Sequence, residues 1–308
     1  MQAANPSKII FIVGPTGVGK SKVGLELARL LDAEIVSCDA MQVYREVSIA
    51  NDKPSAAELE SVKHHMVGCV SVTEEFDVAR YRKEAVEVIE DILKRNKLPL
   101  IVGGSGMYVS ILLDGIFEGG TEDPFIRRQL EDDAKVQGIE KLYLRLKKVD
   151  PDSAAKINPN DARRIIRSLE VYVAMRKPIS EVQKRRTGLW GKYDIRIFAL
   201  NRERQELYDR VNRRVDAMFD GGLIEEMKSL KELPLSRTAS GMIGVPEVTE
   251  YLDGKAPLED VKETMKMNSR HYVKRQLTWF RKDKRPTWID LREDESPAET
   301  AERIRTMI

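Results

Sequence analysis

The segment Gly14–Ser21 constrains the fold of this chain more strongly than any other. It reads Gly-Pro-Thr-Gly-Val-Gly-Lys-Ser and matches the pattern G-x-x-x-x-G-K-[ST] of a phosphate-binding loop. An apolar run, Lys8–Val13, comes directly before it, and the apolar positions of Ser21–Leu31 repeat with a helical period. A strand, a glycine-rich turn and a helix in this order place backbone N–H groups and a helix N terminus around phosphate oxygens.

Each residue type in this loop suits the binding of a diphosphate. Glycines let the backbone approach the ligand, Lys20 supplies a positive charge, and the hydroxyl of Ser21 is suited to Mg²⁺. We therefore predict a diphosphate site formed by Gly14, Pro15, Thr16, Gly17, Val18, Gly19, Lys20 and Ser21. Such loops are common in ATP-binding and other nucleotide-binding proteins, but the residues alone fit any pyrophosphate.

The elements that follow predict an α/β fold. Ala33–Ser37 reads as a second strand, Val78–Arg95 as an amphipathic helix, and Leu98–Val102 as a third strand. This alternation predicts a P-loop NTPase-like parallel sheet flanked by helices on both faces. The second strand ends at Cys38-Asp39, so that Asp39 would project beside the phosphate loop at the carboxyl edge of the sheet.

A helical module interrupts this core. Gly119-Gly120 and Asp123-Pro124 mark a break, the patterns that follow are helical, and Asp161 is suited to cap the helix that ends at Met175. A strand pattern returns at Tyr193–Leu200. We expect a catalytic core made of residues 1–117 and 191–308, with an all-helical insertion at 118–190.

The positive charges are unevenly distributed, although the net charge is only +2. The segment 163–214 holds fifteen Lys and Arg against six Asp and Glu, and 270–285 holds seven basic residues against one acidic residue. Aromatic residues lie between the basic ones, which favours a polyanionic partner over merely solvated helix faces. No apolar stretch is long enough to cross a bilayer, and neither Cys38 nor Cys69 belongs to a metal-binding motif. We expect a cytoplasmic protein without a membrane contact.

Asp39 favours a transferase over a hydrolase. A nucleotide hydrolase usually has a second apolar strand that ends in Asp or Asp-Glu, whereas Leu98–Val102 ends in Gly103-Gly104. A lone carboxylate beside the phosphate loop suits a general base that faces a nucleophile. A turn or helix-capping role for Asp39 is the structural alternative.

Six segments together resemble the tRNA dimethylallyltransferases. They occur in the family's order and span nearly the whole chain: Gly14–Ser21, Ser37–Tyr44, His64-His65-Met66, Val102–Tyr108, Asn160–Arg167 and Arg270–Arg281. The chain departs from the family pattern at Ile49-Ala50-Asn51-Asp52-Lys53-Pro54, at Ile243-Gly244-Val245 and at Ser105, where threonine is more usual. These departures leave the phosphate loop and Asp39 intact.

The resemblance implies an activity and its chemical groups. The enzyme would transfer a five-carbon group from dimethylallyl pyrophosphate to N6 of the adenosine 3′ of the anticodon (position 37) in tRNA, with Mg²⁺ as cofactor. Asp39 would be the base, Thr16 and Ser21 would bind the diphosphate and metal, and Lys20 would stabilise the developing charge. Arg210 matches an arginine of the diphosphate site, although the sequence alone favours an exposed helix charge.

The resemblance also implies positions that bind tRNA. These are Asp39, Ala40, Met41, Gln42, Ser105, Arg127, Arg163, Arg164, Ile165, Ile166 and Arg167. Arg164 and Arg167 are three residues apart and so share a helix face, as residues that follow a phosphate backbone should. The target adenine would be flipped out of its stack, and the helical module would hold the anticodon stem-loop. We expect the protein to act as a monomer.

Two other functions are compatible with parts of the pattern. A small-molecule kinase would use ATP through the same loop, but would leave the basic helical module unexplained. A non-catalytic RNA-binding protein with a vestigial loop would not need Lys20, Ser21 and Asp39 together. Among the remaining residues, His64-His65 lacks an evident third metal ligand, and Trp279 and Phe280 could equally stack on bases or pack in the core.

Overall fold

The computed structural model describes residues 7–117 and 123–308, and it divides into two compact units. One unit comprises Met1–Leu112 and Trp190–Ile308, and the other is Leu113–Leu189. The expected start of the insertion at 118 and the Gly119-Gly120 break lie outside the described residues. The expected end of the insertion at 190 lies beside the observed end at Leu189.

The larger unit is built on a six-stranded sheet in the order β3-β2-β4-β1-β5-β6. Its strands all pair in parallel, which confirms the predicted fold class. Their bounds are β1 (Lys8–Val13), β2 (Ala33–Ser37), β3 (His64–His65), β4 (Leu98–Gly103), β5 (Asp194–Asn201) and β6 (Thr287–Asp290). The sequence patterns missed the edge strands β3 and β6, which are too short to show an alternation.

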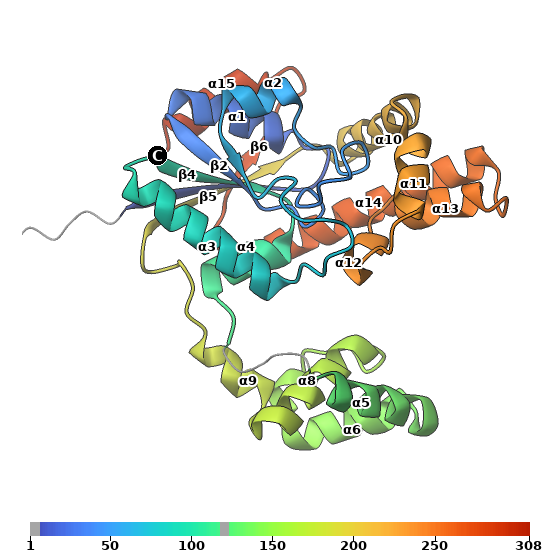
Figure 1. Cartoon of the computed structure of the whole chain (residues 1–308). Helices are drawn as coiled ribbons and strands as arrows, with labels where there is room; N and C mark the ends of the chain where they lie inside the picture. Colours follow the sequence, from blue (N-terminus) through green and yellow to red (C-terminus); the bar gives the residue numbers. More distant parts are fainter. Residues whose placement is uncertain (1–6, 118–122) are drawn as a thin grey trace, which may run out of the picture. The chain divides into compact units, whose positions relative to one another are not determined.

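Helices cover both faces of this sheet (Figure 1). Helices α1 (Lys20–Leu30) and α15 (Pro297–Arg305) lie together on one face, and α3 (Val78–Lys94) and α4 (Gly106–Asp114) lie on the other. The remaining helices of the larger unit are α2 (Ala56–Ser61), α10 (Arg204–Asp220), α11 (Leu223–Lys231), α12 (Arg237–Ser240), α13 (Val245–Leu252) and α14 (Leu258–Lys282). None of the helices in the described part of the chain combines the length and apolar character of a membrane span.

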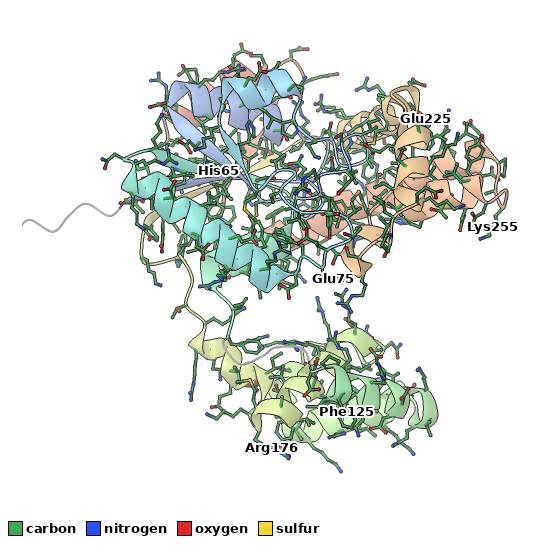
Figure 2. All side chains as sticks on the ribbon, viewed as in Figure 1. His65, Glu75, Phe125, Arg176, Glu225 and Lys255 are labelled. Carbon is green, nitrogen blue, oxygen red and sulfur yellow. The ribbon has the colours of Figure 1, made fainter. Side chains whose placement is uncertain are left out.

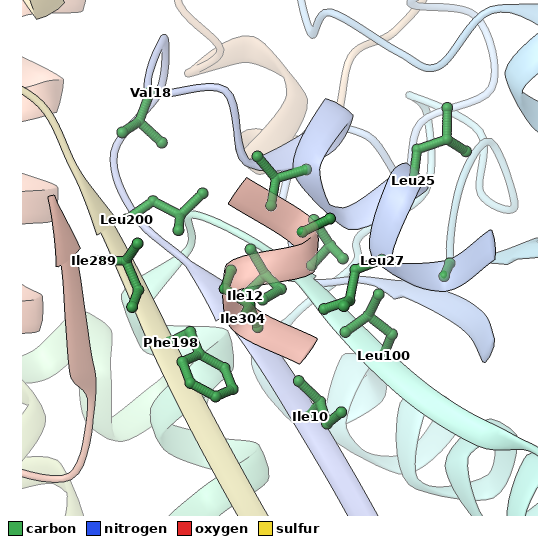
Figure 3. Packing of buried hydrophobic residues seen from close by; sticks show 14 of the residues in the cluster. Ile10, Ile12, Val18, Leu25, Leu27, Leu100, Phe198, Leu200, Ile289 and Ile304 are labelled. Carbon is green, nitrogen blue, oxygen red and sulfur yellow. The ribbon is translucent and has the colours of Figure 1, made fainter. Parts of the chain in front are cut away.

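The core lies between the sheet and these helices. The residues of β1 and β4 are apolar at nearly every position because a parallel sheet is buried on both faces. On the face covered by α1 and α15, Ile10, Ile12 and Leu100 pack with Leu27 and Ile304, and all five side chains are fully buried (Figure 3). This packing fixes where the two central strands end.

The order of the strands determines where on the sheet a ligand is expected to bind. From β1 the chain passes to β2, beyond β4, whereas from β4 it passes to β5 on the opposite side of β1. Connections that leave neighbouring strands in opposite directions open a crevice at their carboxyl ends, where ligands bind in open α/β sheets. The phosphate loop follows β1, and Gly104 and Ser105 follow β4.

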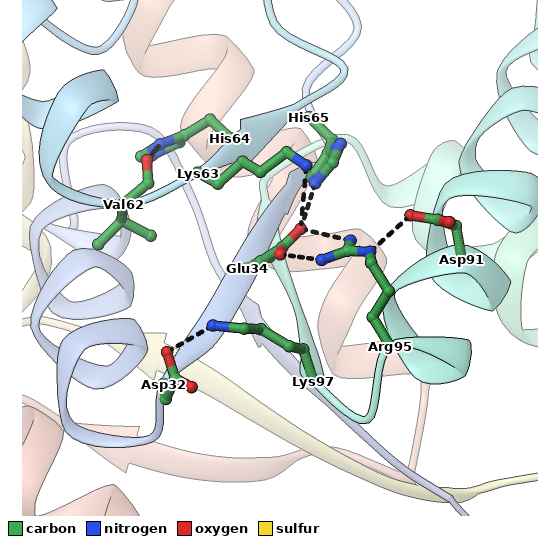
Figure 4. Close-up of polar contacts among 9 residues, drawn as sticks. All are labelled: Asp32, Glu34, Val62, Lys63, His64, His65, Asp91, Arg95 and Lys97. Carbon is green, nitrogen blue, oxygen red and sulfur yellow. Dashed lines mark hydrogen bonds and ion pairs between the residues drawn. The ribbon is translucent and has the colours of Figure 1, made fainter.

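A polar cluster ties β2 and β3 to the end of α3 (Figure 4). The buried carboxylate of Glu34 on β2 accepts hydrogen bonds from both Nη atoms of Arg95, and its Oε2 lies 2.7 Å from His65 Nε2. The bonds from Arg95 lower the pKa of Glu34 to about 2, although burial acts in the opposite direction. Asp32 and Lys97 form a separate, more exposed ion pair at 2.7 Å.

The smaller unit is helical. It contains α5 (Pro124–Gln137), α6 (Ile139–Val149), α7 (Pro151–Ala154), α8 (Ala162–Met175) and α9 (Ile179–Val182), followed by a 3-10 turn at Gln183–Arg185. The side chain of Asp161 accepts a hydrogen bond from Arg164 N–H, which confirms the expected cap of α8. The unit has its own apolar core around Leu142, Leu146 and Leu169. Figure 2 labels Phe125 on α5, which is 69% exposed.

Candidate active site

The phosphate loop takes a conformation that its glycines allow. Gly14 and Gly17 have φ angles of 151° and 78°, which lie in the region that disfavours side chains. A Cβ on Gly17 would lie 2.8 Å from Cγ2 of Val211, and one on Gly14 would lie 2.8 Å from the carbonyl oxygen of Leu200. The loop therefore fits closely against α10 and β5, and Gly19 leads directly into the N terminus of α1.

Two arginines hold the loop from its outer side. Arg210 Nε donates to Gly17 O at 2.8 Å, and Arg202 Nε donates to Val18 O at 3.0 Å. These bonds use loop carbonyl groups and so occupy none of the loop's amide groups, of which those of Thr16 and Val18 make hydrogen bonds within the protein. The structure thus places Arg210, half-buried, against the phosphate loop, where the sequence alone favoured an exposed position.

A cavity of about 200 Å³ opens beside the loop and contains the carboxylate that the sequence singled out. Thr16, Lys20, Ser21 and Asp39 all line it. The lining also includes the apolar side chains of Ile35, Met41, Val102, Met218, Met242, Ile243 and Met265. A cavity lined by both charged and apolar side chains suits a ligand that joins a phosphate group to a short hydrocarbon.

A second cavity, of about 580 Å³, also borders the loop and is basic. Its cationic lining residues are Lys20, Lys22, Lys53, Arg210, Arg213 and Arg214. Six residues line both cavities: Lys20, Ser21, Asp52, Pro54, His64 and Arg214. Lys20 and Ser21 therefore face both the first cavity, which has apolar lining residues, and the basic second cavity.

Asp39 stands on a turn that neighbouring backbone fixes. Its Oδ1 accepts a hydrogen bond from Met41 N–H at 3.0 Å, while Ala40 N–H donates to the hydroxyl of Ser105 at 2.9 Å. Ser105 N–H in turn donates to Cys38 O at 3.1 Å. Ser105, which is buried, therefore supports the turn that carries Asp39, and its expected RNA contact stays a prediction.

The next residues of this turn also face the first cavity. Met41 and Gln42 line it, and Ala40 lies between Asp39 and Met41 in the chain. Ser37 Oγ lies 3.0 Å from Gln42 Oε1, and Gln42 Nε2 donates to Asp52 O at 3.0 Å. These bonds connect the Asp39 turn with the loop that contains Asp52.

Lys20 is buried at the centre of these groups. Burial lowers the pKa of its ammonium group, Asp39 and Asp52 act to raise it, and Arg214 lowers it. Its Nζ lies 3.5 Å from Pro15 O, a long contact that leaves the charge available to a ligand. An anion bound at the loop would therefore meet a poorly solvated positive charge, which strengthens the attraction.

The predicted residues of the helical unit divide into two kinds. Arg163 and Arg164 are exposed, whereas Arg127 and Arg167 each lie 3.1 Å from the buried carboxylate of Glu170. The side chains of Ile165 and Ile166 are buried in the core of this unit, so their expected RNA contact would have to come from the backbone and stays a prediction. The helical period of α8 places these two side chains on its inner face and those of Arg163 and Arg164 toward solvent.

Sequence reasoning missed Gln276, whose buried side chain makes hydrogen bonds to the phosphate loop and to Gly104. Its Oε1 accepts a hydrogen bond from Thr16 N–H and its Nε2 donates to Gly104 O, both at 2.9 Å. A Cβ on Gly104 would lie only 2.5 Å from Gln276 Nε2. A buried glutamine among the apolar positions of Val261–Arg281 was the available signal. Tyr272 and Arg214, which both line the first cavity, were missed as well.

Burial raises the pKa of Tyr272 to about 12, and Asp39 adds to the effect. The hydroxyl of Tyr272 therefore stays protonated beside the carboxylate at neutral pH. A neutral hydroxyl can donate a hydrogen bond to a ligand or to a carboxylate in this cavity.

Among the other candidates, His64 lines both cavities, whereas the rest make structural contacts. Burial raises the pKa of Cys38 to about 12, so that its thiol stays protonated. The ring of His65 is engaged by Glu34, and Nδ1 of His64 lies 2.7 Å from Val62 O. Phe280 is buried in the core, and the ring of Trp279 packs closely on Gly106.

Comparisons with known proteins agree on one family. Residues 42–283 match the family described as IPP transferase. The chain is 43% identical over 301 residues to a tRNA dimethylallyltransferase from Geobacillus thermodenitrificans, covering 96% of this chain and 95% of that protein.

Solved structures give the same result. The full-length tRNA isopentenylpyrophosphate transferase of Bacillus halodurans aligns with a TM-score of 0.70 and 38% identity, covering 97% of this chain and 96% of that one. A eukaryotic dimethylallyltransferase, solved in crystallographic snapshots of its action on tRNA, aligns with a TM-score of 0.83 and 30% identity. That alignment covers 97% of this chain and 77% of the eukaryotic protein.

Proposed function

The chain belongs to the IPP transferase family, and we propose that it transfers a dimethylallyl group from dimethylallyl pyrophosphate to N6 of adenosine 37 in tRNA. One observation carries the proposal: a single cavity brings Asp39, the phosphate loop and an apolar wall together. The products are N6-isopentenyladenosine in tRNA and pyrophosphate.

The phosphate loop binds the leaving group in this proposal. When the bond between the allylic carbon and the pyrophosphate oxygen breaks, negative charge develops on the departing oxygen. Lys20 and the loop's amide groups stabilise that charge, and the half-buried Arg210 holds the loop in place. Because Lys20 is poorly solvated, its attraction for the developing charge is stronger than that of an exposed lysine.

Asp39 accepts the proton in this proposal. As N6 of adenine forms its bond with the allylic carbon, the amine loses a proton, and the Asp39 carboxylate takes it. The turn bonds from Met41 and Ala40 keep this carboxylate in the cavity. The methionines Met218, Met242 and Met265 supply a flexible apolar wall for the dimethylallyl group.

Mg²⁺ fits the donors of the first cavity. Hydroxyl groups of Thr16 and Ser21 and the carboxylate of Asp39 are hard oxygen ligands, which Mg²⁺ prefers. Ser21 and the diphosphate would hold the ion, whose charge would stabilise the leaving group. So few protein carboxylates are typical of a magnesium ion held mainly by substrate phosphates.

A tRNA partner explains why the positive charges are concentrated in the segments 163–214 and 270–285. Adenine N6 is inaccessible inside a stacked anticodon loop, so the base must flip out to enter the cavity. The exposed side chains of Arg163 and Arg164 are suited to phosphate groups of the anticodon stem-loop. In this proposal the enzyme acts as a monomer in the cytoplasm.

The direct test is a product assay with unmodified tRNA, Mg²⁺ and dimethylallyl pyrophosphate, followed by mass spectrometry of the digested nucleosides. We expect isopentenyladenosine with the wild type, and none with Asp39→Ala, whose tRNA affinity should be unchanged. A matched tube with ATP in place of the prenyl donor serves as control. ATP consumption without a modified nucleoside would favour the kinase alternative, and an unchanged rate with Asp39→Ala would exclude Asp39 as the base.

A further inference from the structure

The residues shared by the two cavities include a second carboxylate, that of Asp52. Asp52 lines both cavities together with Lys20, Ser21 and Arg214. Its Oδ2 lies 3.3 Å from Nη1 of Arg214. Burial lowers the pKa of Lys20, and the negative charge of Asp52 partly opposes this effect. The proposed chemistry assigns no role to this group.

Asp52 is the acidic group of the basic cavity that remains available to its cations. The acidic residues lining that cavity are Asp52 and Glu58. Glu58 is engaged in capping α2, because its Oε2 accepts hydrogen bonds from the N–H and the hydroxyl of Ser55, both at 2.8 Å. Asp52 has no comparable helix to cap, and its side chain is 63% exposed.

Hydrogen bonds fix the backbone around Asp52, and this places the residue in the lining that the two cavities share. Asp52 has a φ of 52°, a left-handed conformation that Asp and Asn tolerate better than most residues. Its N–H donates to Ile49 O at 3.1 Å. The preceding loop is anchored by Glu226, which accepts hydrogen bonds from the N–H groups of Ser48, Ile49 and Ala50 at 2.7, 2.8 and 3.0 Å.

The guanidinium group of Arg214 is not fully hydrogen-bonded within the described residues. Its Nε is a buried atom without a hydrogen-bond partner among the described residues, and its side chain is only 27% exposed. A guanidinium group has five N–H donors arranged in a fork that fits phosphate. A diphosphate at the loop and the carboxylate of Asp52 would therefore compete for the same cations.

We propose that Asp52 is a built-in counter-anion of the diphosphate site, which holds Arg214 when the site is empty and weakens the binding of pyrophosphate. This inference rests on the proposed function, because it takes the region lined by the shared residues as the diphosphate site. Its consequence is a lower affinity for the pyrophosphate product and thus less product inhibition.

The test is the affinity of the full-length enzyme for inorganic pyrophosphate, measured by calorimetry with Mg²⁺, at fixed ionic strength and without tRNA. Asp52→Asn removes the charge and keeps a residue that tolerates the left-handed backbone. We expect pyrophosphate to bind about two- to fivefold more tightly to this variant, as the loss of one exposed ion pair allows. The inhibition constant for pyrophosphate in the transfer assay should fall by the same factor.

Two further variants make the test specific. Asp32→Asn is a matched control, because Asp32 also has a left-handed φ, of 47°, and an exposed ion pair, but lines neither cavity. It should leave the pyrophosphate affinity unchanged. In an Arg214→Gln background, Asp52→Asn should lose most of its effect, since the cation that it releases is absent.

The outcomes separate this inference from the proposed function. Unchanged or weaker pyrophosphate binding by Asp52→Asn would overturn the counter-anion role, and weaker binding only with Mg²⁺ would make Asp52 a metal ligand instead. Equal gains in both backgrounds would overturn the competition for Arg214. If the wild type bound no pyrophosphate at all, the diphosphate site itself would be wrong and both proposals would fall.

Discussion

At the scale of single residues, Gln276 shows how one side chain can hold a binding loop. The two ends of its amide differ and make different hydrogen bonds, since the oxygen accepts from Thr16 N–H and the nitrogen donates to Gly104 O. A glutamate could make only the first of these bonds. It would also bring a negative charge close to Gly14–Ser21, where the diphosphate should bind.

We therefore predict that Gln276→Glu weakens pyrophosphate binding at least about tenfold, whereas Gln276→Leu loses about 1–3 kcal/mol of stability because it leaves two buried backbone groups unpaired. Calorimetry and thermal unfolding measure the two effects separately. Gln137→Leu, at an exposed position of α5, is the control and should change neither quantity. Equal pyrophosphate affinities for Gln276→Glu and the wild type would show that Gln276 does not position the loop.

The candidate site was predictable where its chemistry is local. The phosphate loop and Asp39 are each recognisable within a few residues, and the structure brings them into one cavity. Gln276 could not be assigned in the same way, because its partners Thr16 and Gly104 lie 260 and 172 residues away. Only the fold reveals such a contact.

At the scale of elements, the long segments were predictable and the short ones were not. Among the central strands, β1 and β4 have nearly continuous apolar runs, which tertiary packing then buries, whereas β2 contains Glu34 and β5 contains Arg196. The helix α15 was missed although Ser296 and Glu299 form a capping box at its N terminus. Sequence reading could have used this signal. The two-residue strand β3 has no pattern of its own and exists because β2 offers a free edge.

The cluster around Glu34 predicts how these elements respond to acid. Folding lowers the pKa of Glu34 from 4.5 to about 2, so the folded state favours the ionised carboxylate. Its contribution is complete above about pH 4.5 and is lost as the pH falls toward about 2. We expect this loss to amount to roughly 2 kcal/mol, since solvent around the partly exposed Arg95 screens the interaction.

Urea unfolding of the wild type and of Glu34→Gln between these pH values tests this prediction. The variant should be less stable than the wild type at neutral pH and should lose less stability on acidification. Asp32→Asn changes the neighbouring exposed ion pair and should keep the wild-type pH dependence. If Glu34→Gln and the wild type lost stability in parallel, the contribution of Glu34 to acid sensitivity would be refuted.

At the scale of the whole molecule, the two units divide the proposed work. The larger unit contains both cavities, and the helical unit contains the arginines expected to bind tRNA. Those arginines are not equivalent. Arg167 and Arg127 both pair with the buried Glu170, so that removal of Arg167 would leave this carboxylate with one cationic partner fewer in the unit's interior. Arg164 is 62% exposed and only loosely paired with Asp161, at 3.5 Å.

We therefore predict that Arg164→Ala weakens tRNA binding without changing pyrophosphate affinity or thermal stability, whereas Arg167→Ala also destabilises the helical unit. Because a phosphate contact releases counterions, the slope of log affinity against log salt should fall by about 1 for Arg164→Ala. Lys135→Ala, which removes another exposed charge of the same unit, is the control and should keep the wild-type slope. A wild-type salt slope for Arg164→Ala would mean that Arg164 does not contact the tRNA backbone. Lower stability of this variant would show instead that its pairing with Asp161 supports α8, in which case the salt slope alone decides the RNA contact.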